Sequence, residues 1–371
     1  MMNLKRGGLV VLALSAGVAA HAGITLSAKS TFGNFGGPGG AGWYSPGEGG
    51  NAFIGTAGLE RGLAYSSATN KLYMLSRNGG VNIRIMNADT GADEGNLNAT
   101  GISGGTFAAN MIASDGDGNV YAANLTTNTN TSALKVYRFG PADLTGGTPS
   151  TTVFNSTITA AGTSRLGDSF DAMGSGANAR LVLGFSGSNG YTVITPGGSA
   201  TTSNAIASTG NGDFRLGVTF VGSTAQVWGK QTGANPGAAP LRRTTSGVLD
   251  GSSTLTSGGE MAMDYATVGG FNLLATLDAN SSIVRIYEVT GSGAGTTLTL
   301  RSSLTTTSGT LTANGNAAGQ VRFGAISGNK ATIYAMSSNQ GVQAFEVAVP
   351  EPASMIAIGF GIAAIVRRKK K

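Results

Sequence analysis

The sequence contains no cysteine and one histidine, His21, among 371 residues. Disulfide bonds are therefore excluded, and so are metal sites and nucleophilic sites that depend on a thiolate. His21 lies in an N-terminal segment that is expected to be removed, so a Ser-His-Asp triad is excluded from the mature chain as well. Stability must come from apolar burial and hydrogen bonding, for which a body of more than 300 residues is long enough.

Charged side chains are also scarce, at 11% of the chain. Seven of the 24 basic residues lie at the two ends, at Lys5, Arg6 and 367–371, so the region 23–349 contains 17 basic and 17 acidic residues. Nucleic-acid binding needs basic side chains that neutralise phosphates. The formal charge of +6 is therefore no evidence for a nucleic-acid partner.

The N-terminus has the pattern of an export signal. Lys5 and Arg6 precede an apolar stretch, 9–20, and Ala20 and Ala22 give a small-x-small cleavage pattern around His21. We expect a signal helix over residues 1–22 and cleavage after Ala22. The alternative, a retained membrane helix, is disfavoured because the apolar stretch is too short to span a bilayer.

The C-terminal segment, 349–371, combines three physical features. A Pro350-Glu351-Pro352 motif disfavours helix and stays extended. The apolar run 353–366 would form a helix of only about 21 Å, against a hydrocarbon core of roughly 30 Å. Five cations follow it and mark a cytoplasmic membrane stop: Arg367, Arg368, Lys369, Lys370 and Lys371.

This tail resembles the PEP-CTERM sorting signal of Gram-negative bacteria, whose chains are recognised and processed by a membrane-embedded exosortase. The resemblance covers about the last 23 residues. It implies export, a transient stay in the inner membrane through the C-terminal segment, and delivery to the cell surface or the extracellular space. The alternatives are an ordinary C-terminal membrane anchor and a buried final helix, and the five terminal cations disfavour the latter.

The region 23–348 has the composition of a β protein. Its glycines, together with Thr, Ser and Asn, separate short alternating runs rich in Val, Ile, Phe and Tyr, which is typical of strands joined by tight turns. Within it, residues 33–58 are rich in glycine, and we expect a flexible surface loop there. Trp43 and Tyr44 are expected to hold this loop against the domain.

A repeat of four short strands identifies the fold as an all-β propeller of about six blades. The first unit has strands at 61–65, 71–77 and 81–86 and a weak fourth strand near 95–97. The units span 61–97, 110–154, 169–207, 214–255, 260–304 and 320–349. The last unit shows only three strands, and the alternating segment 23–29 could complete it. Seven blades, a β-sandwich and a β-helix remain alternatives.

The first two units also resemble an uncharacterised propeller-like domain found on many PEP-CTERM proteins. The segments that show this are 61–65, 70–73 and 120–125. This resemblance supports the fold and implies no chemistry, because such domains have no established activity.

One acidic segment could start a calcium loop. Asp115, Asp117 and Asn119 alternate with glycines as the first ligands of such a loop do. Val120 and Thr126 then stand where glycine and glutamate are needed. We therefore expect a hairpin turn, no metal and no cofactor.

Three carboxylates and four aromatic side chains are further candidates for a site. Asp168 and Asp171 are close in sequence beside an expected inner strand, and Asp264 holds a similar place in a later unit. Paired carboxylates could support glycoside hydrolysis, although turn and cap roles are commoner. The aromatic residues could line a sugar-binding surface, although packing between blades is the default; they are Tyr65, Phe170, Phe323 and Trp228.

The sequence therefore favours an exported surface or matrix protein that binds or supports other molecules, with exosortase and the export machinery as partners. Extracellular polysaccharide is a candidate ligand, and no catalytic residue is assigned. A secreted carbohydrate-active enzyme using paired carboxylates is the alternative. Ice binding is a third hypothesis, but no regular Thr-x-Thr ladder supports it.

Overall fold

Strands make up nearly all the regular structure of the computed structural model, which describes residues 23–351 except 146, 204 and 232–239. Its only helices are five short 3-10 turns: η1 (Glu48–Gly50), η2 (Pro141–Asp143), η3 (Thr159–Ala161), η4 (Gly176–Asn178) and η5 (Gly293–Gly295). Within these described ranges, no helix is long and apolar enough to cross a membrane. The expected signal helix and C-terminal apolar helix lie outside the described residues.

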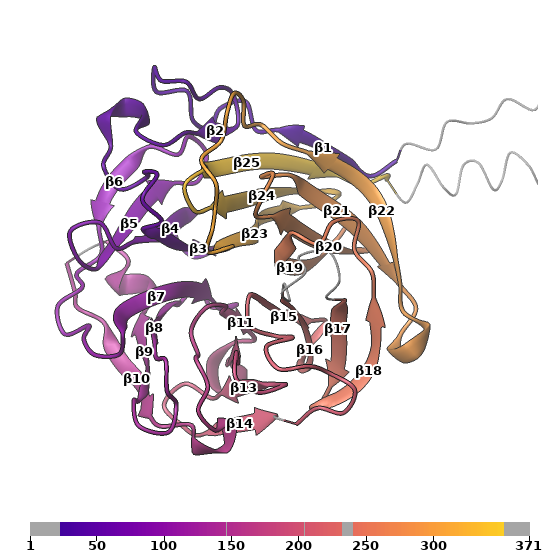
Figure 1. Cartoon of the computed structure of the whole chain (residues 1–371). Helices are drawn as coiled ribbons and strands as arrows, with labels where there is room; N and C mark the ends of the chain where they lie inside the picture. Colours follow the sequence, from indigo (N-terminus) through magenta and orange to yellow (C-terminus); the bar gives the residue numbers. More distant parts are fainter. Residues whose placement is uncertain (1–22, 146, 204, 232–239, 352–371) are drawn as a thin grey trace, which may run out of the picture.

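Six antiparallel sheets are arranged in a ring around a central axis (Figure 1). Blade 1 contains β3 (Glu60–Ser66), β4 (Lys71–Ser76), β5 (Asn82–Asn87) and β6 (Asp93–Asn96). Blade 2 contains β7 (Phe107–Ser114), β8 (Val120–Leu125), β9 (Leu134–Phe139) and β10 (Thr151–Ser156). Blade 3 contains β11 (Asp171–Met173), β12 (Arg180–Gly184), β13 (Tyr191–Ile194) and β14 (Ala200–Ser203).

The second half of the chain repeats this plan. Blade 4 contains β15 (Gly217–Val221), β16 (Ser223–Lys230), β17 (Leu241–Thr245) and β18 (Val248–Ser253). Blade 5 contains β19 (Glu260–Val268), β20 (Phe271–Asp278), β21 (Val284–Thr290) and β22 (Thr297–Leu304). Blade 6 contains β23 (Gly319–Ser327), β24 (Lys330–Ser337) and β25 (Gly341–Ala348), with two N-terminal strands, β1 (Thr25–Ala28) and β2 (Trp43–Tyr44). The prediction of a six-bladed propeller is confirmed, and seven blades, a sandwich and a β-helix are excluded.

The ring is closed by pairing the start of the described chain with its end. β1 pairs antiparallel with β25, with Leu26 opposite Val347, so it supplies the fourth strand of blade 6. The expectation that segment 23–29 completes the last blade is confirmed. Figure 1 shows β1 lying along β25 at the rim. Closure removes two exposed sheet edges at once.

We predict that this closure contributes measurably to stability through Ile24. Ile24 immediately precedes β1 and is 6% exposed in the apolar cluster between blades 5 and 6. Ile24→Ala should lower the free energy of unfolding by about 2–3 kcal/mol through lost burial and a residual cavity. Urea unfolding measures this, with Thr25→Ala, on an exposed residue of β1, as the matched control. Equal effects of the two substitutions would contradict this role.

One apolar cluster fills each of the interfaces between neighbouring blades. Tyr73 packs with Ile112 between blades 1 and 2, for example, and Trp228 with Leu274 between blades 4 and 5. At Gly217, near the axis, two inner strands approach so closely that only glycine fits. A Cβ atom at Gly217 would lie 1.8 Å from the carbonyl oxygen of Met261 in the next blade. Part of the high glycine content therefore serves the crowded centre of the ring.

Two aromatic residues anchor the glycine-rich segment 33–58 to the propeller. Trp43 and Tyr44 form β2, pair with Gln343 and Val342 of β25, and are each 4% exposed. The expected anchoring by these two aromatic residues is confirmed. Glu48 is also packed against the segment, since it is 1% exposed and its carboxylate accepts the backbone amides of Phe35 and Ser45; the flexibility expected of the segment stays a prediction.

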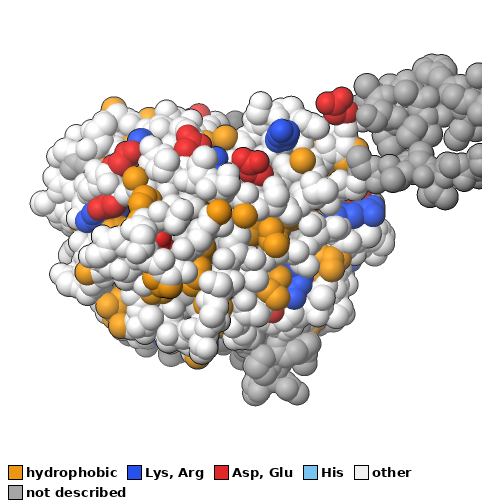
Figure 2. Space-filling view, turned by 90° about the horizontal axis from the view of Figure 1, so that it is seen from above, with side chains coloured by type: hydrophobic (Ala, Val, Ile, Leu, Met, Phe, Trp, Pro, Cys, Tyr) orange, Lys and Arg blue, Asp and Glu red, His pale blue; other side chains and the backbone are white. Residues whose placement is uncertain are grey.

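The outer surface has few charges, in agreement with the composition. Figure 2 shows charged side chains singly or in small groups over the face seen from above, among mostly uncharged polar surface. Apolar side chains on this face form small separate groups. This face therefore offers no broad charged surface for a partner.

Candidate functional site

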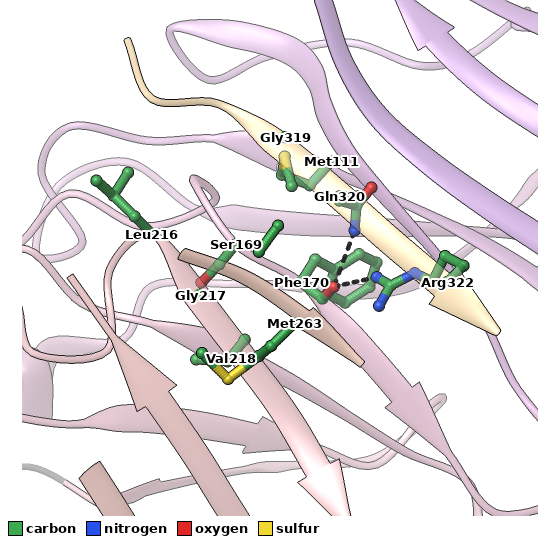
Figure 3. A pocket seen from close by; sticks show the side chains of 11 residues that line it. Met111, Ser169, Phe170, Leu216, Gly217, Val218, Met263, Gly319, Gln320 and Arg322 are labelled. Atoms are coloured by element: carbon green, nitrogen blue, oxygen red, sulfur yellow. Dashed lines mark hydrogen bonds between the residues drawn. The ribbon is translucent and has the colours of Figure 1, made fainter. Parts of the chain in front are cut away.

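The centre of the ring is formed by the first strand of each blade, and each of these inner strands contacts its neighbours. A cavity among them has a volume of about 10 Å³, which is room for about one water molecule. Its lining includes Phe170, Gly217, Met263 and Gln320 (Figure 3). The central channel of this propeller is therefore filled by side chains and backbone.

Two polar side chains of β23 fill the channel and join blades that are distant in sequence. The Gln320 amide nitrogen donates to the carbonyl oxygens of Ile112 and Phe170, and its oxygen accepts the amide of Leu63. Arg322 donates to the same Phe170 carbonyl at 2.6 Å (Figure 3). Blade 6 is thus hydrogen-bonded directly to blades 1, 2 and 3 across the axis.

Arg322 also brings two carboxylates together. Its Nη1 lies 3.2 Å from Oδ1 of Asp171 on β11 and 3.9 Å from Oδ1 of Asp264 on β19. Each carboxylate accepts a backbone amide of the next blade, since Asp171 binds Phe220 at 2.9 Å and Asp264 binds Phe323 at 2.7 Å. We call Asp171, Asp264 and Arg322 the central ion cluster.

The two carboxyl groups of this cluster are hard to ionise. Burial raises the pKa of Asp171, an effect that the Arg322 charge partly offsets. Burial likewise raises the pKa of Asp264 to about 7, with Arg322 opposing the shift and the Asp171 charge adding to it. One cation facing two carboxylates therefore leaves Asp264 close to half-protonated near neutral pH.

This arrangement links blades and leaves little room for catalysis. A general acid or base must reach its substrate within hydrogen-bonding distance, yet a volume of about 10 Å³ cannot admit a sugar ring. The carboxylate oxygens of Asp171 and Asp264 already accept backbone amides. The cluster therefore acts as a set of connections between blades.

Asp168 and Asp171 bind different partners. Asp168 lies in a second ion cluster, where Arg165 binds both carboxylate oxygens at 2.6 and 2.7 Å and Arg215 binds Oδ2 at 2.8 Å. These arginines lower the pKa of Asp168 against the opposing effect of burial. The predicted likeness of Asp171 and Asp264 holds, because both belong to inner strands and meet at Arg322.

The four candidate aromatic residues pack between blades. Tyr65, Phe170, Phe323 and Trp228 are 9%, 2%, 8% and 4% exposed. Tyr65 stacks on Tyr334 with ring centroids 5.9 Å apart, which joins blade 1 to blade 6. The packing interpretation is confirmed, and these residues form no sugar-binding surface.

The acidic segment near Asp115 is the hairpin turn between β7 and β8. Asp115 Oδ1 accepts the amides of Asp117 and Asn119, and Oδ2 accepts the Tyr121 hydroxyl at 2.7 Å. Its oxygens are therefore engaged within the turn. Within the part of the chain that the structure describes, no group of three or more His, Cys, Asp or Glu side chains could hold a metal ion.

Sequence reasoning missed Gln320, Arg322 and Glu48, which are all at least 95% buried. Gln320 and Arg322 alternate with apolar residues on an inner strand, and polar groups in such a strand need buried partners. That alternation was the sequence signal from which the burial of Gln320 and Arg322 could have been predicted. The glycines around Glu48 gave no sequence signal that its side chain would be buried.

The described chain reaches the start of the sorting segment. Val349 is 3% exposed, and its amide donates to the Asn329 carbonyl at 2.8 Å. Pro350 and Glu351 follow, and Glu351 is exposed. Pro352 and the five terminal cations lie outside the described residues, as do Ala20 and Ala22. The packed body thus ends at Val349, directly before the Pro-Glu-Pro sequence.

Comparison with protein families identifies this last segment. The model described as PEP-CTERM protein-sorting motif matches residues 348–371. The chain carries a PEP-CTERM sorting motif. The motif implies exosortase-dependent export to the cell surface or the extracellular space.

A second family model covers the first half of the propeller. The domain of unknown function DUF4623 matches residues 44–214, which span blades 1 to 3. Neither matching model describes an enzyme. No curated protein matches the chain.

Solved structures agree with the fold of this PEP-CTERM protein. A DUF4623 family protein from Bacteroides eggerthii matches with a TM-score of 0.62 and 17% identity, over 80% of this chain and 72% of that one. An α-L-arabinofuranosidase from Fusarium graminearum matches with a TM-score of 0.49 and 10% identity, over 78% and 92% of the two chains. At these identities the likeness extends to the fold alone.

Proposed function

We propose that this PEP-CTERM protein is a non-enzymatic binding or structural protein of the cell surface or extracellular matrix. The observation that carries the proposal is the cavity among the inner strands beside the buried carboxylates, whose volume of about 10 Å³ is too small for a sugar ring. The carboxylates best placed for acid-base chemistry are committed to bonds between blades. A ring of this kind can still bind other molecules on its outer surface.

The proposal includes processing at both ends. Residues 1–22 act as a signal peptide cut after Ala22, and exosortase processes the chain near Pro350, Glu351 and Pro352. Before exosortase acts, the apolar run 353–366 enters the inner membrane transiently, and the cations from Arg367 to Lys371 stop it there. Asn329 and Val349 support this division, because their hydrogen bond ends the packed body just before the motif.

We predict that deleting residues 350–371 abolishes sorting without unfolding the propeller. Val349 keeps its contacts in this variant, while every residue that exosortase would recognise is lost. Fractionation of a host that expresses exosortase, with mass spectrometry of the mature C-terminus, should show the parent chain processed and at the surface. The truncated chain should remain unsorted. Surface delivery of the truncated chain would defeat the proposal.

A secreted carbohydrate-active enzyme is the second candidate, favoured by one observation. Burial raises the pKa of Asp264 to about 7, a value suited to a general acid. Hydrolysis assays on a panel of polysaccharides test it with Asp171→Asn and Asp264→Asn. Turnover that disappears with either substitution would replace the binding proposal with the enzymatic one.

A further inference from the structure

Four arginines lie near the end of the central channel where the inner strands begin. We call this end of the channel the channel mouth. Arg61 is the second residue of β3, and Arg77 directly follows β4. Arg165 precedes β11, and Arg215 precedes β15. We call these four residues the arginine cluster, and they come from blades 1, 3 and 4.

Positive charge exceeds negative charge in this cluster. Asp168 is bonded directly to Arg165 and Arg215, and its single negative charge offsets one of their two positive charges. Arg61 and Arg77 both donate to a neutral acceptor, the side-chain oxygen of Asn110, at 3.2 Å, and Arg77 also donates to the Gly58 carbonyl at 3.3 Å. Glu60 lies nearby, but its carboxylate accepts the amides of Gly55 and Asn339. Two guanidinium groups thus have no ion pair with a carboxylate in the described chain.

Two donors of these guanidinium groups are buried and lack an acceptor among the described residues. They are Nη1 of Arg61, a residue only 4% exposed, and Nε of Arg77. Proteins rarely bury a charged donor without a partner. Burial, and next the charge of Arg77, lower the pKa of Arg61 to about 10, with Arg165 adding to the repulsion. The cluster is therefore short of negative charge.

The solvent side of the cluster can be reached by a ligand. The side chains of Arg165 and Arg215 are 30% and 34% exposed, and Arg77 is partly exposed. The guanidinium carbon of Arg77 lies 3.7 Å from the ring centroid of Phe107, which is itself 40% exposed. An exposed aromatic ring in contact with Arg77, one of three partly exposed arginines of the cluster, combines an apolar platform with donors for an oxyanion.

We propose that the channel mouth binds an acidic saccharide. A sugar carboxylate would accept hydrogen bonds from Arg77 and its neighbours in the arginine cluster, and the sugar ring would pack on Phe107. Guanidinium groups suit this role because their planar donors match both oxygens of a carboxylate. The proposal deepens the extracellular binding role above and rests on it. Binding in vitro does not require sorting, so the two can fail separately.

The test uses the full chain in detergent and isothermal titration calorimetry at low salt. The probes are trigalacturonate, neutral galactotriose and inorganic phosphate. Trigalacturonate should bind, more weakly as salt rises, and galactotriose should bind at least about tenfold more weakly. Arg77→Met should weaken trigalacturonate binding by about tenfold or more. Phe107→Ala should weaken it as well, but leave any phosphate binding unchanged.

Arg180→Met is the matched control, because Arg180 begins β12 on the opposite face and makes no ion pair in the described chain. It should leave binding unchanged. Arg77 is partly exposed, so its replacement should leave the melting temperature within the range of the control. Three results would overturn the proposal: no binding of trigalacturonate, equal binding of galactotriose, or binding of phosphate alone.

Discussion

Replacing Arg322 with methionine should lower the free energy of unfolding at pH 7 by about 3–5 kcal/mol, the cost of breaking a buried ion pair from one side. Arg322 is 5% exposed, and its loss leaves Asp171 and Asp264 facing each other without a cation. It also removes donors from the carbonyl oxygens of Leu63 and Phe170. The midpoint of urea unfolding at constant m-value measures the effect.

Two comparisons make this result specific. Arg301→Met removes an ion pair with Glu288 from a side chain that is 44% exposed, and should cost no more than about 1 kcal/mol. Asp171→Asn and Asp264→Asn, added to Arg322→Met, remove the stranded charges and should recover part of the loss. If Arg322→Met and Arg301→Met were equally mild, the central ion cluster would not be the connection that its geometry indicates.

Asp264→Asn should make the protein more stable than the parent chain at pH 8. The pKa of Asp264 is about 7 in the folded protein, because of burial, and lies well above its value in the unfolded chain. The folded state therefore holds a proton that the unfolded state has released. The parent chain loses stability as the pH rises from about 4 to about 7, and the loss is complete above that range.

Asparagine cannot ionise, yet its side-chain oxygen can still accept the Phe323 amide. The variant should therefore unfold at a higher urea concentration than the parent at pH 8, and this difference should shrink as the pH falls toward 4. Urea unfolding between pH 4 and pH 8 should show a flatter profile for the variant. Asp93→Asn, at a more exposed ion pair with Arg84, is the control. Parallel profiles for parent and Asp264→Asn would contradict the assignment.

Local patterns predicted most of the fold. Alternation and turn residues located the strands of blades 1 and 2, and the missing fourth strand of the last unit indicated closure by segment 23–29. These features depend on neighbours in sequence, which composition and spacing report directly. The C-terminal sorting segment could also be predicted from local sequence, because its proline motif, apolar run and cations are contiguous.

The centre of the ring was not predictable in this way. Arg322 meets Asp171 across 151 positions of sequence, and Gln320 meets Ile112 across 208. The partner of each buried charge depends on the number of blades and on how the ring closes. No local sequence pattern encodes the blade number or the closure. The role of Asn110 was not predictable either, because its side-chain oxygen accepts hydrogen bonds from Arg61 and Arg77 only when blades 1 and 2 are packed together.

The pairing of β1 with β25 makes closure of the ring depend on both ends of the folded body. Ser27 donates to the carbonyl oxygen of Glu346, 319 positions away, so the earliest strand to emerge must wait for the final one. Blades 1 to 5 draw each of their strands from one continuous segment, but the ring stays open until β25 is available to pair with β1. Because Pro350 follows β25 by two residues, the strand that completes the ring lies directly before the sorting motif.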